Sequence, residues 1–150
     1  MMKKRDEAAV STFTSGYNCA QSVLSSFEDL LPLERNELLS VSAGFGGGMG
    51  KLQKTCGAVT GAFMALSMYA SEKKSKPEEA KELANELIRE FYARFNDEKG
   101  TSSCRDLLGV DMNSEVGQRI ASEKDLFGTV CPEAVATATR ILEEMIVKRA

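Results

Sequence analysis

Four cysteines are the residues of this 150-residue chain best suited to chemistry, and no histidine accompanies them. They are Cys19, Cys56, Cys104 and Cys131. No two of them form a C-x-x-C motif, which excludes the thioredoxin motif, the usual zinc knuckle and the ferredoxin spacings. The absence of histidine excludes Ser-His-Asp and Cys-His mechanisms and every histidine-ligated haem. Any site chemistry is therefore expected to be carried by sulfur.

The residues beside each cysteine are typical of the first turn of a helix. Residue types that cap helices or fit their first turn are Asn18 before Cys19, Thr55 before Cys56, Ser103 before Cys104, and Thr129 and Pro132 around Cys131. A helix N-terminus carries roughly half a positive charge, so it stabilises a thiolate. Four such termini would roughly offset the net charge of four thiolates around a divalent centre. We expect the cysteines to converge into one site, with the nearby cations Lys51, Lys54 and Arg105 acting in the same direction.

A glycine cluster between residues 44 and 50 invites comparison with phosphate-binding loops. The template G-x-x-x-x-G-K followed by Ser or Thr needs a glycine at Phe45 and a hydroxyl at Leu52, and G-x-G-x-x-G fails in every register. The sequence therefore predicts no nucleotide site. The cluster is either a flexible turn between two helices or a backbone nest, in which Gly47 and Gly48, together with Gly57, bring amide groups to an anionic centre beside Cys56.

Helical periodicity dominates the chain, and the sequence predicts an all-α, single-domain bundle over residues 1–150. Apolar residues recur at helical spacing over residues 76–95, and shorter helices are expected over 4–14, 18–30, 33–43, 102–108 and 114–122. A last helix is expected to begin at Pro132. Residues 56–70 carry no charge on any face, so they are expected to form the central helix of about five to seven. Glycine and alanine recur there at four-residue spacing and would let another backbone approach closely.

Composition limits the partners and the compartment. Apolar residues make up 43% of the chain and charged residues 27%, with a formal net charge of −3. A mildly acidic surface disfavours nucleic acid and anionic membranes, and no stretch is apolar for long enough to cross a bilayer. No secretory leader is evident, so a cytoplasmic location is expected. A redox partner protein and a homodimer both remain open.

At the cysteines the sequence closely resembles the family named for the motif C-GCAxxG-C-C, redox-active proteins with four characteristic cysteines. The resemblance covers nearly the whole chain and rests on five segments: Gly16–Ala20, Gly46–Gly50, Cys56–Gly61, Cys104–Leu107 and Cys131–Pro132. The central motif reads Thr-Cys-Gly-Ala here, so a variant that requires glycine before the cysteine is not matched. The resemblance implies an all-helical domain and a redox or metal role for the four cysteines. Some larger relatives add c-type haem, but this chain has no C-x-x-C-H motif, so haem does not carry over.

Three functional hypotheses follow. In the first, the four cysteines hold an iron–sulfur cluster, or less readily Zn²⁺, for electron transfer or sensing. In the second, the thiols carry out metal-free disulfide chemistry, for which three pairings are possible. In the third, the chain is a non-enzymatic helical interaction protein whose cysteines fill the core. The first is favoured by a small margin, and any enzymatic activity would be of the oxidoreductase type.

Overall fold

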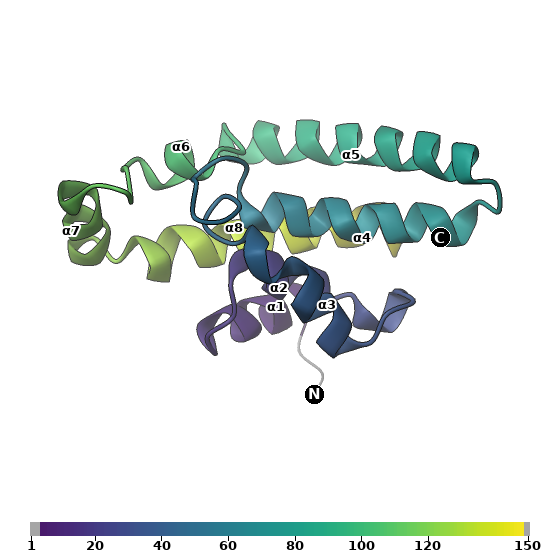
Figure 1. Cartoon of the computed structure of the whole chain (residues 1–150), viewed down its shortest axis with the longest axis horizontal. Coiled ribbons are helices and arrows are strands. Elements are labelled where there is room, and N and C mark those ends of the chain that lie inside the picture. The colour runs from purple at the N-terminus through teal and green to yellow at the C-terminus, as the bar shows by residue number, and fades with distance from the viewer. Residues whose placement is uncertain (1–3, 149–150) are drawn as a thin grey trace.

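The computed structural model describes residues 4–148 as a bundle of helices with no strand in that range (Figure 1). The α-helices are α1 (Arg5–Thr14), α2 (Cys19–Ser25), α3 (Arg35–Ser42), α4 (Gly57–Lys73), α5 (Pro77–Lys99), α6 (Cys104–Leu108), α7 (Glu115–Glu123) and α8 (Leu126–Ile146). Two short 3₁₀ helices, η1 (Glu28–Leu30) and η2 (Ala43–Phe45), lie between them. The all-α prediction is confirmed, and the short helices α6 and α7 bring the number of α-helices between residues 4 and 148 to eight rather than five to seven.

The uncharged stretch forms α4 and lies at the centre of the bundle, as expected. Helices α2, α5 and α8 all pack against it. A side chain at Gly61 would place its Cβ 2.7 Å from the carbonyl oxygen of Ala20. The small residues of α4 therefore let the backbone of α2 come close enough to exclude any β-carbon at this position.

Helix α5 is the long amphipathic helix predicted from its periodicity. It begins with Pro77, whose missing N–H is not needed at the first helical position, and ends at Gly100 in the left-handed conformation (φ 81°). Its buried face carries Phe91 and Phe95, and the Phe91 ring meets Phe63 of α4 edge-to-face at 6.0 Å. Figure 1 shows α5 running beside α4, and the aromatic contact helps to hold the two helices together.

Helix α8 begins six residues earlier than the sequence predicts. It begins at Leu126, after Asp125 in the left-handed region (φ 50°), and contains Pro132 in its interior. Proline has no N–H, so the carbonyl of Gly128 lacks the hydrogen bond it would receive in a regular helix. The expectation that Pro132 occupies a first turn is wrong, because a six-residue helix segment precedes it in the bundle.

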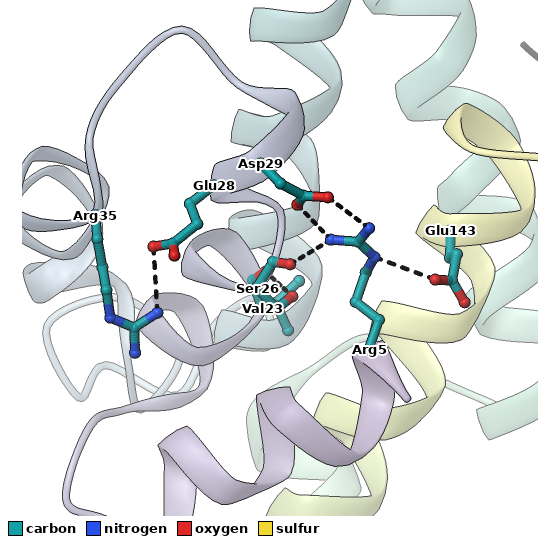
Figure 2. Close-up of polar contacts among 7 residues, drawn as sticks. All are labelled: Arg5, Val23, Ser26, Glu28, Asp29, Arg35 and Glu143. Carbon is teal, nitrogen blue, oxygen red and sulfur yellow. Dashed lines mark hydrogen bonds and ion pairs between the residues drawn. The ribbon is translucent and has the colours of Figure 1, made fainter. Parts of the chain in front are cut away.

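One arginine ties the N-terminal helix to three other parts of the chain (Figure 2). Arg5 donates to both carboxylate oxygens of Asp29 at 2.7 and 3.0 Å and to the carbonyl of Ser26. It also donates to Glu143 of α8 at 3.1 Å, and its guanidinium lies 4.7 Å from the centre of the Phe27 ring. This clamp holds α1 against α8 and against the turn that follows α2.

Over residues 4–148, no helix combines the length and the apolar character needed to cross a membrane.

Candidate redox site

All four cysteines line one pocket of about 960 Å³. The pocket lies between the start of α2, the glycine loop of residues 44–50, the starts of α4 and α6, and the first half of α8. Cys19 and Cys56 are buried, with 9% and 6% of their surfaces exposed, whereas Cys104 and Cys131 are half-buried. Residues that are up to 112 positions apart in the sequence thus share one cavity.

A capping box positions Cys19 at the first residue of α2. The side chain of Asn18 accepts from the amide of Gln21 at 2.9 Å, and the Gln21 side chain accepts from the amide of Asn18 at 3.0 Å. Asn18 also donates to the carbonyl of Ala43 at 2.9 Å. Because the cap is anchored to the residue just before the glycine loop, Cys19 is held against that loop.

A reciprocal backbone bridge places Cys56 and Cys104 beside each other. Thr55 and Ser103 form an isolated antiparallel bridge, flanked by hydrogen bonds of 2.7 Å from the Cys56 amide to Ser102 and from the Cys104 amide to Lys54. The bridge joins the starts of α4 and α6. Cys56 and Cys104 each follow one of its two residues, so their side chains lie on the same face of the bridge, diagonally opposite each other. Cys56 is the N-cap of α4, and Cys104 is the first residue of α6.

Cys131 differs from the other three because it does not begin a helix. It is the sixth residue of α8, next to Pro132. The prediction that all four cysteines occupy first turns is therefore confirmed for three and wrong for Cys131. The charge balance that assumed four helix N-termini loses one of them, and the seven-residue α2 and five-residue α6 are short.

The glycine loop folds as a tight turn in which several residues have left-handed backbone conformations. Gly47 and Gly48 have φ values of 64° and 74°, and Met49 follows at 68°. A Cβ on Gly48 would lie 2.5 Å from the Cα of Gln53, because the loop closes on itself through the hydrogen bond from the Gln53 amide to the Gly47 carbonyl. Glycine is required at Gly48 for both reasons.

The three glycines predicted to bind a cofactor, Gly47, Gly48 and Gly57, all line the pocket. A Cβ on Gly57 would lie 2.9 Å from the carbonyl of Phe45 and 3.2 Å from the Cβ of Cys19. Gly57 therefore has a packing role that brings α4 close to Cys19. A cofactor-binding role for these glycines stays a prediction.

Cys19 and Cys131 interact directly. The thiol of Cys19 donates a hydrogen bond to the sulfur of Cys131, and this bond lowers the pKa of Cys131. The same bond, together with burial, raises the pKa of Cys19 well above its ordinary value. The pair therefore gives up its first proton readily and its second with difficulty, and the half-buried Cys131 carries the resulting charge.

Cys56 and Cys104 stay protonated over a wider range. Burial raises the pKa of Cys56 to about 11, although the amides of Ala58 and Val59 donate to its sulfur and oppose the shift. Burial, followed by the charges of Cys56 and Cys131, raises the pKa of Cys104 to about 12. Near neutral pH these two cysteines are thiols, whereas Cys131 is the most readily ionised of the four.

One cation that affects the pKa of Cys56 is not indicated by the sequence. Lys99, at the end of α5, lowers the pKa of Cys56 and pairs with Glu133 of α8 at 2.9 Å. Of the three predicted cations, Lys51 lines the cysteine pocket, whereas Lys54 and Arg105 line a neighbouring polar pocket of about 730 Å³ that shares Gln53 and Asn113 with it. An effect of Lys54 and Arg105 on the thiols stays a prediction.

Gln53 is a second residue that sequence reasoning does not single out. It is buried, its side chain interacts with Cys104, and its amide group joins Val110 and Met112 through bonds of 2.9 and 2.7 Å. These partners lie 57 and 59 residues away. No local pattern reports such a contact, so no signal in the sequence identifies Gln53 as a support of the site.

The four thiols are a donor set that suits soft metals and iron–sulfur clusters. Within residues 4–148, however, no three or more Cys, Asp or Glu side chains are grouped closely enough to hold a metal ion. The cysteines share a pocket, and within it the direct contact is between Cys19 and Cys131.

One comparison with known proteins identifies a family. A family model described as "Putative redox-active protein (C_GCAxxG_C_C)" matches residues 17–145, which include all four cysteines and the glycine loop. No curated protein and no solved structure gives a significant match to the chain.

Proposed function

Because the chain belongs to this family of redox-active proteins, we propose that Cys19 and Cys131 are a redox pair that cycles between two thiols and one disulfide. The observation that carries the proposal is that the two cysteines line one pocket, where the interaction between their side chains shifts the pKa of each thiol. A disulfide between them also requires Cα atoms within about 7 Å of each other. The lowered pKa of Cys131 supplies the thiolate that disulfide exchange requires.

The two cysteines take different roles. Cys131 is half-buried and the more acidic thiol, so its thiolate attacks an incoming disulfide or other two-electron oxidant. Cys19 is buried beneath it and resolves the intermediate by attacking the Cys131 sulfur. One S–S bond forms within the protein, two protons leave the two thiols, and two electrons pass to the oxidant.

A count of free thiols in cysteine variants tests this function. Reduced protein has four thiols, and one equivalent of the thiol oxidant diamide is expected to leave two, with dithiothreitol restoring all four. Cys19→Ser and Cys131→Ser are expected to abolish the fast loss of thiols, whereas the matched variants Cys56→Ser and Cys104→Ser retain it. Loss of the fast phase in Cys56→Ser or Cys104→Ser, with retention in Cys131→Ser, contradicts the proposed pair.

A four-thiolate centre is the second candidate, and its support is that Cys19, Cys56, Cys104 and Cys131 line one pocket. These four would hold an iron–sulfur cluster, or less readily Zn²⁺, and such a cluster would supply one-electron transfer. The glycine loop, which also lines the pocket, would lie beside the cluster. Metal analysis and visible absorption of anaerobically purified protein test this candidate: near-stoichiometric iron supports a cluster, and colourless, metal-free protein contradicts it.

A further inference from the structure

The wall of the cysteine pocket differs in character from the remainder of the protein surface. Apart from the sulfurs and the glycine loop, it is largely apolar and includes Phe13, Leu107, Leu108, Phe127 and Val130, with Asn18, Gln53, Asn113 and Gln118 as its uncharged polar residues. Its volume of about 960 Å³ is that of a site for a small organic molecule rather than for a single atom or ion. The pocket therefore has room for a substrate in front of the reactive sulfur.

The charge of the pocket is as informative as its size. Apart from the Cys131 thiolate, Lys51 is the only charged group among the described residues that line it, and Lys51 is exposed. The neighbouring polar pocket, by contrast, is lined by Lys54, Arg105, Asp106 and Asp111. A charged ligand would lose its hydration in the cysteine pocket, where an anion would find only the exposed Lys51 and a cation only the Cys131 thiolate that the reaction consumes.

Aromatic surface at the N-terminal end of α8 continues the apolar wall outward. Phe127 lies one turn before Cys131 and is 47% exposed. Because residues four apart share a helix face, Phe127 and Cys131 line the same side of the pocket. An apolar substrate in contact with Phe127 would be guided to the sulfur.

We infer that the pocket is a substrate site for small, uncharged, largely apolar organic disulfides and that it excludes charged ones. The inference rests on the proposed thiol–disulfide function. The Cys131 thiolate attacks one sulfur of the substrate R–S–S–R, forming a mixed disulfide and releasing RS⁻, which takes the proton of the Cys19 thiol. Cys19 then attacks the Cys131 sulfur and releases the second RS⁻, which takes up a proton from solvent. The protein gains one disulfide, and the substrate becomes two RSH molecules.

Three disulfides of similar length and different charge test the inference. They are bis(2-hydroxyethyl) disulfide, which is neutral, dithiodiglycolate, which carries two carboxylates, and cystamine, which carries two ammonium groups. Each rate of oxidation of the intact, reduced protein is divided by the rate of the same disulfide with a small free thiol, which removes differences in intrinsic reactivity. The normalised rate of the neutral compound is expected to exceed those of both charged compounds by about tenfold or more. Lipoamide, a neutral disulfide with a longer apolar arm, is expected to react faster still.

A variant of the wall provides the second measurement. Phe127→Ala is expected to lower the normalised rate of lipoamide by about threefold to tenfold while leaving oxidation by diamide unchanged. Val116→Ala is the matched control, because Val116 is 59% exposed and does not line the pocket. This control is expected to leave both rates unchanged.

The outcomes separate the inference from the function on which it depends. If diamide forms the disulfide but the three normalised rates lie within about twofold of one another, the substrate inference is overturned and the redox pair stands. The same conclusion follows if a charged disulfide reacts fastest or if none of the organic disulfides reacts. If diamide leaves all four thiols intact, the proposed function itself fails.

Discussion

At the scale of single residues, the reactivity of Cys131 depends on the thiol that it touches. The hydrogen bond from Cys19 lowers the pKa of Cys131 by stabilising its thiolate, although Cys131 does not begin a helix. A neighbouring thiol thus takes the place of the helix N-terminus expected from the sequence. The acidity of Cys131 should therefore respond to Cys19 more than to any nearby cation.

Replacing Cys19 by alanine tests this dependence. Cys19→Ala removes the donor and is expected to raise the pKa of Cys131 by roughly one to two units, since a hydrogen bond to a charged group contributes about 1.5–3 kcal/mol. The measurement is the rate of Cys131 alkylation by iodoacetamide as a function of pH. Cys104→Ala is the control, because Cys104 does not lower the pKa of Cys131. An unchanged pH midpoint in Cys19→Ala contradicts the account.

Burial of Cys56 predicts a pH dependence of stability. The folded protein holds the pKa of this thiol at about 11, against 9.0 for an unperturbed thiol. Below pH 9 both states keep the proton, whereas above it the unfolded chain loses the proton first, so the free energy of unfolding falls as the pH rises. The loss attributable to Cys56 is on the order of 2 kcal/mol.

Urea unfolding of reduced protein across this range measures the effect. Cys56→Ser retains a side chain able to cap α4 but has no thiol to titrate, so its stability should decline less steeply with pH than that of the parent protein. Parallel declines in the two proteins would show that burial of Cys56 is not the cause.

At the scale of helices, the contact between α2 and α4 determines how close Cys19 lies to the remaining cysteines. Gly61→Ala would drive a methyl group to within 2.7 Å of the Ala20 carbonyl oxygen, which belongs to the backbone and cannot rotate away. We expect a loss of about 1–3 kcal/mol in the free energy of unfolding. Gly44→Ala is the matched control, because its Cβ would meet no atom within 4 Å, and a change below about 0.5 kcal/mol is expected. Urea unfolding of the two variants decides between these values, and equal stabilities would contradict the close packing.

The helices also show which structural features a sequence can reveal. The periodicity of residues 76–95 and the lack of charge over residues 56–70 are local properties, and they predict α5 and α4 well. The predicted start of α8 is wrong. Thr129 and Pro132 are typical of a helix N-terminus, whereas the helix begins after Asp125, which has an uncommon left-handed conformation. A local signal could not indicate that the bundle extends the helix by another six residues.

At the scale of the whole molecule, Arg5 connects segments that are 138 residues apart. Arg5→Met would leave the Asp29 and Glu143 carboxylates and the Ser26 carbonyl without this donor, and we expect a loss of about 1–3 kcal/mol in the free energy of unfolding. Arg35→Met is the control shown in the same view, since Arg35 makes an exposed ion pair with Glu28 at 3.5 Å (Figure 2). That control should change stability by less than about 1 kcal/mol. Thermal or urea unfolding provides both values, and equal losses would show that Arg5 is not a clamp.

The assembly of the site is also a property of the whole chain. The sequence identifies the four cysteines and predicts that they converge, and three of them do begin helices or cap them. It could not identify the contact between Cys19 and Cys131, the Thr55–Ser103 bridge or the support from Gln53 and Lys99. Each of these joins residues at least 43 positions apart, and only the folded bundle brings them together.

The most direct test of the central claim is a peptide map of the oxidised protein. Reduced protein is treated with one equivalent of diamide, the remaining thiols are blocked with N-ethylmaleimide in denaturant near neutral pH, and the disulfide-linked peptides are identified by mass spectrometry. The account predicts one dominant linkage, between Cys19 and Cys131, with Cys56 and Cys104 recovered as alkylated thiols. A dominant linkage between Cys56 and Cys104, or four alkylated thiols with no linkage, would contradict it.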